Sequence, residues 1–136
     1  MNIESIATKN VITVRTSDSL LTASKLLREK GIRHLPVVDA AGRLAGMLTD
    51  RDIKRASASE ATSLEIHELL YLLDKLDVSK VMTKKPVSVT PQTPVSEAAA
   101  LMVRHKIGCL PVVDGGRLAG IVTEIDMLRV LASGGA

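Results

Sequence analysis

The sequence predicts an α/β (α+β) fold built from two tandem β-α-β-β-α repeats joined by a helical connector. The chain has 136 residues, which is the usual size of one compact domain. It carries LPVVDAAGRLAGMLTDRDI from Leu35 and a near copy, LPVVDGGRLAGIVTEIDM, from Leu110. In both copies short β-branched runs alternate with helical patterns, which indicates strands and helices packed in layers.

The repeat extends over most of the chain. Pro36 and Pro111 lie 75 positions apart (111 − 36), and after Asp39 and Asp114 the spacing falls to 74. The one-residue difference falls in an Ala/Gly turn, where insertions are tolerated, so the copies are a structural repeat. The two spacings pair Thr8 with Thr83, Ile32 with Ile107, Gly46 with Gly120, Thr49 with Thr123 and Asp52 with Asp126.

Each copy begins with a short strand and a helix. The runs VITV and VSV, which end at Val14 and Val89, predict the strands. Asp18 and Thr93 stand where a helix N-cap is expected, and Pro94 suits the first helical position. The helices that follow have apolar faces formed by Leu20, Ala23, Leu26 and Leu27 in one copy and by Val95, Ala98, Leu101 and Met102 in the other.

Each copy continues with two strands around a glycine-containing turn, and a short helix then begins at about Asp50 or Glu124. One repeat of roughly 50 residues cannot cover its own apolar face, so we expect the copies to pack about a pseudo-two-fold axis. The expected organisation is a first repeat at 1–57, a helical connector at 58–77 and a second repeat at 78–136.

The connector sequence TSLEIHELLYLLDKL predicts a helix, and Thr62 with Glu65 can form a capping box at its start. Its apolar stripe either faces a partner, most simply in a homodimer, or wraps its own domain. The sequence leaves both readings open. The stripe consists of Ile66, Leu69, Leu70, Leu73 and Leu76.

Composition excludes several classes of protein. Hydrophobic residues make up 46% and charged residues 24%, as in a soluble globular domain. The net charge of +3 is dispersed, whereas nucleic-acid binders carry a clustered basic stripe, so no nucleic-acid partner is expected. Cys109 is the only cysteine, which excludes an internal disulfide. No signal pattern or long apolar run is present, so we expect a cytoplasmic protein without a membrane partner.

The ordered motifs resemble the CBS-domain family, in which two tandem copies form a Bateman module. The second copy matches through VMTKKPVSVTPQTPVSEAAALM, IGCLPVVD and GIVTEID, and the first through IATKNVITV, GIRHLPVVD and GMLTDRD. The connector ATSLEIHELLYLL further resembles CBS pairs of the acetoin-utilisation type. The resemblance implies a regulatory module without a required cofactor. It would bind AMP, ADP, ATP or S-adenosylmethionine in clefts between the copies and act on an unidentified protein partner.

Thr49 and Asp52 are expected at a strand-to-helix corner. The carboxylate can accept charge-assisted hydrogen bonds from vicinal ribose hydroxyls, and the free N–H groups of the helix start suit a phosphate. Arg51 adds a planar donor fork for phosphate oxygens. A lone Thr-x-x-Asp is most often a plain helix cap, but its recurrence as Thr123 and Asp126 favours a ligand site.

The resemblance also implies that Arg33 and His34 reach the phosphates, although His34 alone could be a surface or capping residue. In the second copy these positions hold Gly108 and Cys109, and Ile125 replaces Arg51. We therefore predict that the Asp52 site prefers phosphorylated adenosines. The Asp126 site is expected to be weaker, empty or suited to a less anionic ligand. Adenine would be read by backbone groups near Thr13 and Ser88, between aliphatic walls formed by Ile32, Val37, Ile107 and Val112.

An enzyme is not expected. His34, His67 and His105 do not recur with carboxylates at metal-ligand spacing, and no P-loop is present. Cys109 precedes LPVVD and is expected to be a buried, inert thiol. The alternatives are a dimeric interaction scaffold with degenerate clefts and, from the basic net charge alone, a nucleic-acid-associated regulator.

Overall fold

The computed structural model describes residues 1–60 and 65–134 and confirms a mixed fold of helices and strands. It divides into two compact units. The four-stranded unit comprises Ile12–Ala41 and Ala45–Lys85. The two-stranded unit comprises Met1–Val11, Gly42–Leu44 and Pro86–Ala136.

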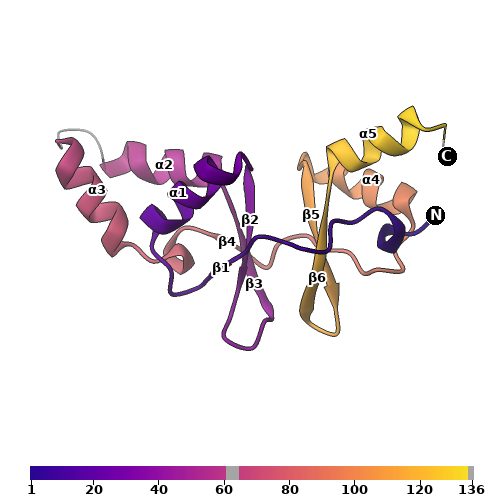
Figure 1. The fold of residues 1–136 in the computed structure, drawn as a ribbon, viewed down its shortest axis with the longest axis horizontal. Coiled ribbons are helices and arrows are strands. Elements are labelled where there is room, and N and C mark those ends of the chain that lie inside the picture. The colour runs from indigo at the N-terminus through magenta and orange to yellow at the C-terminus, as the bar shows by residue number, and fades with distance from the viewer. Residues whose placement is uncertain (61–64, 135–136) are drawn as a thin grey trace. The chain divides into compact units, whose positions relative to one another are not determined.

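The four-stranded unit is a small sheet with helices on it (Figure 1). Its strands are in the order β1-β2-β3-β4, with β1 parallel to β2 and β3 antiparallel to β4. Leu20, Leu35, Val37 and Leu48 are fully buried between the helices and the sheet. The elements are β1 (Val14–Arg15), α1 (Leu20–Lys30), β2 (His34–Val38), β3 (Leu44–Thr49), α2 (Asp50–Glu60), α3 (Ile66–Lys75), the 3-10 turn η2 (Val78–Lys80) and β4 (Thr83–Lys84).

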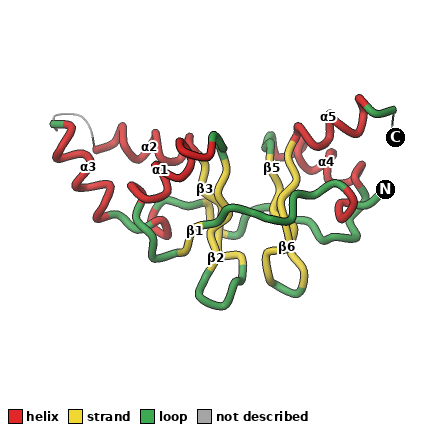
Figure 2. Tube along the Cα trace, in the orientation of Figure 1, coloured by secondary structure: helices red, strands yellow, loops and turns green. Residues whose placement is uncertain are grey.

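The two-stranded unit is built around the antiparallel pair β5-β6, with α4 and α5 beside it (Figure 2). Cys109 is paired with Thr123, and a bulge lies between Val112 and Val113. The predicted VSV strand is reduced to one parallel bridge between Val89 and Val112. The elements are η1 (Ile3–Ser5), α4 (Val95–His105), β5 (Cys109–Asp114), β6 (Arg117–Thr123) and α5 (Glu124–Ala132).

The segment before each first strand packs in the unit that contains the other repeat. Ile3 is fully buried with Val112, and Val78, its counterpart 75 positions later, is fully buried with Val37. Thr8 forms an isolated antiparallel bridge with Ile121. Each compact unit therefore combines most of one repeat with the first residues of the other.

The predicted N-caps of the first helix in each repeat were wrong by one residue. Ser19 caps α1 by accepting a hydrogen bond from the Thr22 N–H, and Pro94 precedes α4. Asp18 instead accepts from the Arg15 N–H at 2.8 Å, and Thr93 accepts from the Thr90 N–H at 3.0 Å. Both side chains therefore stabilise the turn before the helix, which a sequence pattern does not distinguish from a cap.

The connector forms α3, which packs on its own unit. Leu73 is buried, and Leu69 and Leu76 pack against the same core, whereas Ile66 and Leu70 are exposed. Glu65 occupies the N-cap position without a side-chain cap, and Thr62, the other member of the predicted capping box, lies outside the described residues. The helix thus covers the core with one side and exposes apolar side chains on another.

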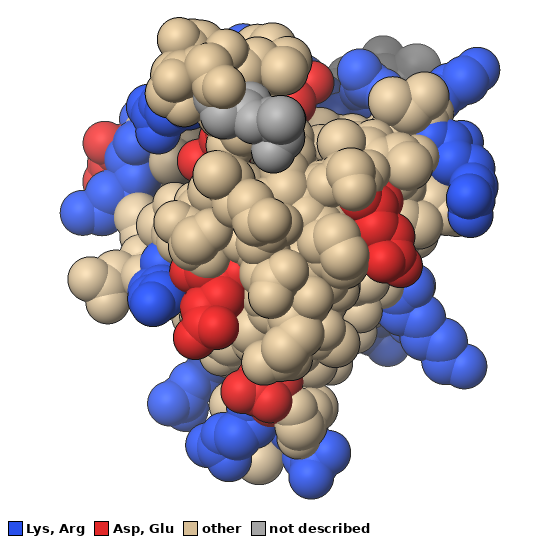
Figure 3. Space-filling view, turned by 90° about the vertical axis from the view of Figure 1, so that its right-hand side faces the viewer, with Lys and Arg blue, Asp and Glu red and all other residues tan. Residues whose placement is uncertain are grey.

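Surface charge is dispersed on the face drawn in Figure 3. Uncharged side chains fill most of it, Asp and Glu lie in separate small groups among them, and Lys and Arg lie around the margin rather than in one stripe. Among the residues that the structure describes, no helix is both long and apolar enough to span a bilayer.

Candidate functional site

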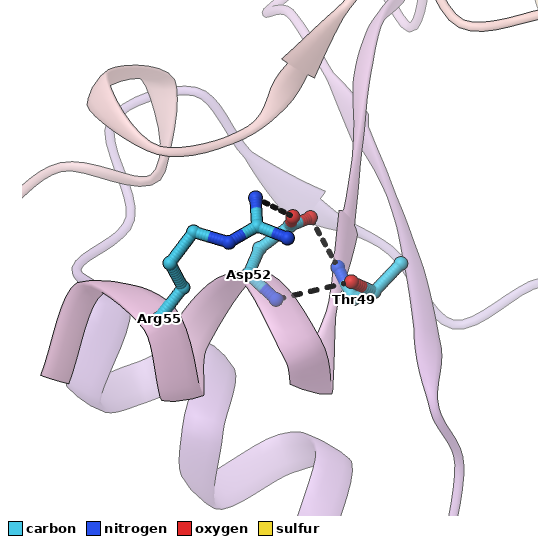
Figure 4. Close-up of polar contacts among 3 residues, drawn as sticks. All are labelled: Thr49, Asp52 and Arg55. Atoms are coloured by element: carbon cyan, nitrogen blue, oxygen red, sulfur yellow. Dashed lines mark hydrogen bonds and ion pairs between the residues drawn. The ribbon is translucent and has the colours of Figure 1, made fainter. Parts of the chain in front are cut away.

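The Asp52 corner, Thr49 to Asp52, is where β3 ends and α2 begins. The Thr49 N–H donates to Asp52 Oδ2 at 3.0 Å, and the Asp52 N–H donates to Thr49 Oγ1 at 3.2 Å (Figure 4). These reciprocal bonds hold the carboxylate in one orientation. The Asp52 side chain is only 13% exposed, so its carboxylate does not project into bulk water.

The Asp126 corner, Thr123 to Asp126, repeats this geometry at the junction of β6 and α5. The Thr123 N–H donates to Asp126 Oδ2 at 2.8 Å, and the Thr123 hydroxyl is 3.2 Å from the same oxygen. Its side chain is 11% exposed. Thr-x-x-Asp therefore forms a helix cap at both corners, but the hydrogen bonds of the cap use only Oδ2 of each carboxylate.

The other carboxylate oxygen faces an arginine at both corners. Arg55 Nη1 lies 4.0 Å from Asp52 Oδ1, and Arg129 Nη1 lies 3.9 Å from Asp126 Oδ1. Figure 4 shows Arg55 reaching back along α2 to Asp52. Neither arginine is among the predicted site residues, although the 74-residue spacing that matches the aspartates also matches Arg55 with Arg129. Extending the alignment three residues further would have found both.

The residues before the LPVVD strands lie beside the helix starts. The Asp50 N–H donates to the Arg33 carbonyl at 3.1 Å, and the Glu124 N–H donates to the Gly108 carbonyl at 3.0 Å. The fold thus brings the predicted phosphate-contacting segment next to the Asp52 corner. There the side chains of Arg33 and Arg51 are exposed and His34 is half-buried.

The Asp126 corner has fewer cationic side chains, because Gly108 and Ile125 stand where the first copy has Arg33 and Arg51. A Cβ atom added to Gly108 would lie 3.2 Å from the carboxylate of Glu124, whose counterpart in the first copy is Asp50. Cys109 is buried, and burial together with the charge of Asp126 raises the pKa of its thiol from 9.0 to about 12. Ile125 is exposed at the position of Arg51.

The predicted adenine-contacting residues differ in accessibility. Val37 and Val112 lie on strands inside the two cores and are closed to solvent. Ile32 and Ile107 are half-buried at the edges of those cores, so they present the more accessible aliphatic surface. Thr13, which is half-buried, precedes β1, and Ser88, which is exposed, precedes the Val89 bridge.

The remaining histidines take no part in a cluster. His67 on α3 and His105 at the end of α4 are exposed. Within residues 1–60 and 65–134, no three His, Cys, Asp or Glu side chains are grouped so that they could hold a metal ion.

Family models match both halves of the chain. The model described as CBS domain covers residues 3–59 and 78–133, which include both corners. The chain belongs to the CBS domain family. A CBS domain-containing protein of Dictyostelium discoideum is 38% identical over 130 residues, which span 95% of this chain and 90% of that protein.

Solved CBS pairs share the fold over nearly the whole chain. The CBS domain pair of protein MJ0100, crystallised with 5′-methylthioadenosine and S-adenosyl-L-methionine, is 30% identical with a TM-score of 0.83, and 98% of each chain is covered. CBSX2 in complex with AMP is 30% identical with a TM-score of 0.81 over 97% of this chain and 96% of that one. The acetoin utilization protein AcuB from Vibrio cholerae is 33% identical with a TM-score of 0.81, covering 98% and 91%.

Some relatives with CBS domains carry enzyme names. The homoserine O-acetyltransferase of Methanococcoides burtonii is 34% identical over 131 residues. The matched region covers 96% of this chain but only 24% of that enzyme. The likeness is therefore confined to a part of the enzyme and carries no catalytic activity over to this chain.

Proposed function

We propose that this CBS pair is a regulatory module that binds an adenosyl nucleotide, of the class of AMP, ADP, ATP or S-adenosylmethionine, and alters a partner protein or an assembly in response. The observation that carries the proposal is the repeated corner with an oriented, mostly buried carboxylate at Asp52 and Asp126. Crystallised complexes of similar CBS pairs with AMP and with S-adenosyl-L-methionine support the class of ligand.

The chemistry of the corner suits a ribose. An ionised carboxylate is an acceptor with about four lone-pair sites, and the cap to the threonine N–H leaves Oδ1 and part of Oδ2 for vicinal hydroxyls. Because the carboxylate is already oriented, a sugar does not have to order it on binding. Low exposure also strengthens each hydrogen bond relative to water.

The two sites are unequal in this proposal. At the Asp52 corner Arg33, His34 and Arg51 would contact the phosphates of the ligand. The Asp126 corner offers Gly108, Cys109 and Ile125 at these positions and would take a less anionic ligand. Adenine would lie near Thr13 or Ser88, against an aliphatic wall from Ile32 or Ile107, and the module would work in the cytoplasm.

A thermal-shift panel with AMP, ADP, ATP, NAD and S-adenosylmethionine tests the proposal. Ligand at a hundred times its Kd should stabilise the folded protein by about 2.7 kcal/mol. An extrinsic dye is needed because the chain has no Trp. Asp52→Asn keeps an acceptor for the helix cap but removes the charge, so it should abolish the largest shift. Asp74→Asn, an exposed acid on α3, is the matched control. A panel without any shift would refute ligand binding.

A second candidate is a dimeric interaction scaffold whose sites bind nothing. It is favoured by large apolar side chains that are exposed on three helices. They are Ile66, Leu70 and Tyr71 on α3, Val103 on α4, and Ile125, Leu128 and Leu131 on α5.

The oligomeric state, measured by light scattering after size-exclusion chromatography, distinguishes the scaffold hypothesis from the sensor hypothesis when it is combined with the thermal-shift result. A homodimer that Ile66→Glu with Tyr71→Glu converts to a folded monomer would place the partner on α3. A dimer combined with no ligand response favours the scaffold, whereas a ligand response favours the sensor whatever the oligomeric state.

A further inference from the structure

The helices α4 and α5 carry apolar side chains on the side that faces away from their core. Ala98 and Met102 of α4 and Val130 of α5 are buried, whereas Val103 is 79% exposed, more than any other large hydrophobic residue that the structure describes. The two helices pack against each other beside the β5-β6 pair, so their outer sides adjoin (Figure 1). These exposed residues form the α4–α5 face, which consists of Ala100, Val103, Ile125, Leu128 and Leu131.

The first repeat shows that the fold does not require apolar residues at these positions. The helices α1 and α2 form the equivalent pair, and the repeat spacings of 75 and 74 residues identify the counterparts of the α4–α5 face. Four of the five counterparts are cations. An apolar surface that the fold itself does not need is typical of an interaction site. The counterparts are Lys25, Arg28, Arg51, Lys54 and Ser57.

The four-stranded unit covers its own helix pair with a third helix. There α3 packs against α1 and α2, and Leu73 of α3 is buried in the same core. Within residues 1–60 and 65–134, the two-stranded unit contains no third α-helix. Its helix pair is therefore open to helices of another molecule.

The charges of α4 match a second copy of α4. Glu97 and Arg104 lie seven residues apart, which is about two turns along one side of the helix. Both are exposed, and neither forms an ion pair with another residue in the part of the chain that the structure describes. In a two-fold dimer, residue i of one chain contacts residue j of the other, and j contacts i. Antiparallel docking of two α4 helices thus sets Glu97 of each protomer opposite Arg104 of its partner.

The equivalent positions of the first repeat do not match a second copy of themselves. Lys25, Arg28, Arg51 and Lys54 all carry a positive charge, so two-fold docking of this side would bring like charges together. The comparison of the two repeats therefore selects the second repeat as the surface that can meet its own copy.

We propose that this chain forms a two-fold homodimer in which the α4–α5 faces of two copies pack together, with the two α4 helices antiparallel. The apolar side chains form the centre of the contact, and the Glu97–Arg104 pairs lie at its two ends. The second repeat of one copy thus meets the second repeat of the other. The outer side of α3 takes no part. The dimer does not need a nucleotide, so the inference goes beyond the proposed function.

Sedimentation velocity on the full-length protein measures the Kd of the dimer and tests the inference. Val103→Arg and Leu128→Lys each install the residue that the first repeat carries at the equivalent exposed position, so both variants should fold. Each should raise the dimer Kd about a hundredfold or more, because a cation then meets its own copy or an apolar surface. Ile66→Glu changes a similarly exposed residue on α3 and is the matched control, which should leave the Kd unchanged.

Charge reversal tests the antiparallel arrangement. Glu97→Arg and Arg104→Glu should each weaken the dimer about tenfold, because each places like charges opposite one another. The double variant should restore the dimer, since the opposite charges meet again with their positions exchanged. A partner other than a second copy would not give this rescue.

A wild-type protein that remains a monomer would overturn the inference, and so would a dimer that Val103→Arg and Leu128→Lys leave intact. Dissociation by Ile66→Glu alone would assign the contact to α3 and overturn it as well. A double variant that stays dissociated would overturn the antiparallel arrangement. The thermal-shift panel reports on the proposed function independently, because Val103 and Leu128 are outside the proposed ligand contacts.

Discussion

Ile3 and Val78 occupy equivalent positions in the two repeats, and each is fully buried in a core whose strands come from the other repeat. The Ile3 N–H donates to the Thr93 carbonyl at 2.9 Å, and the Val78 N–H donates to the Asp18 carbonyl at 2.8 Å. Ile3 packs with Val89, Val112 and Val122 of the second repeat, and Val78 packs with Val14, Val37 and Leu48 of the first. The segment around Ile3 is therefore part of the hydrophobic core of the two-stranded unit.

Ile3→Ala should destabilise the protein by about 2–5 kcal/mol, because it removes buried methyl groups and leaves a cavity. Ile3→Val should cost only about 0.5–1.5 kcal/mol. The free energy of unfolding from urea titrations, followed by circular dichroism, measures both. Ile66→Ala removes the same atoms from an exposed position and serves as the control. An Ile3→Ala protein as stable as the control would show that this segment does not hold the core.

Gly120→Ala should disrupt the contact between the N-terminal segment and β6. A Cβ atom at this position would lie 2.7 Å from the Thr8 carbonyl oxygen, and backbone cannot move away as a side-chain tip can. We expect a loss of about 1–3 kcal/mol in the free energy of unfolding. Gly46→Ala should behave alike, since its Cβ would lie 2.7 Å from the Thr83 carbonyl oxygen.

Gly108→Ala is the control for these overpacking variants. Its Cβ would meet only the carboxylate of exposed Glu124, at 3.2 Å, and that side chain can turn aside. Denaturation midpoints should therefore fall clearly for Gly120→Ala and little for Gly108→Ala. Equal midpoints would mean that the close approach of Thr8 to Gly120 is absent in solution.

Lys106→Gly should stabilise the protein by up to about 1 kcal/mol, the strain of a left-handed lysine less the added flexibility of the unfolded chain. Lys106 ends α4 in the left-handed conformation with φ 55°, and its counterpart Gly31 ends α1 with φ 63°. Glycine adopts this conformation without the Cβ strain that other residues carry. The reciprocal Gly31→Lys should lower the melting temperature. A lower melting temperature for Lys106→Gly would indicate that flexibility of the unfolded chain outweighs the relieved strain.

The Cys109 thiol should react slowly in the folded protein. A pKa raised from 9.0 to about 12 means about a thousandfold less thiolate below pH 9, and thiolate is the reactive species. Iodoacetamide labelling at pH 8, with and without urea, measures this directly. Rapid labelling without urea would contradict the buried site.

The same shift makes stability depend on alkaline pH. The unfolded chain loses the thiol proton above about pH 9, while the folded chain keeps it until about pH 12, so this contribution to stability is lost as pH rises across that interval. Cys109→Ala should show a shallower fall in the free energy of unfolding between these pH values than the wild-type protein. Parallel pH profiles would exclude a role for the thiol.

The repeat alignment was enough to predict the elements around each corner. The Thr-x-x-Asp pattern placed Asp52 and Asp126 in the first turn of a helix because short-range hydrogen bonds govern helix starts. The prediction that Asp18 and Thr93 cap helices was wrong, because each side chain accepts a hydrogen bond in the preceding turn instead. The sequence also carried the arginine pair, since Arg55 and Arg129 follow the matched aspartates at the same spacing.

The sequence by itself determined what is local and periodic in this protein: its helices and strands, its aliphatic core and the two equivalent corners. Only the tertiary structure decided that Ile3 and Val78 exchange cores, that Val37 and Val112 are closed to solvent, and that Oδ1 of each aspartate faces an arginine. The reason is that the hydrophobic effect is non-directional: it depends on the apolar area that is buried and not on which segment of the sequence supplies that area. Two cores of similar composition can each accept either segment, and only packing in three dimensions selects between them.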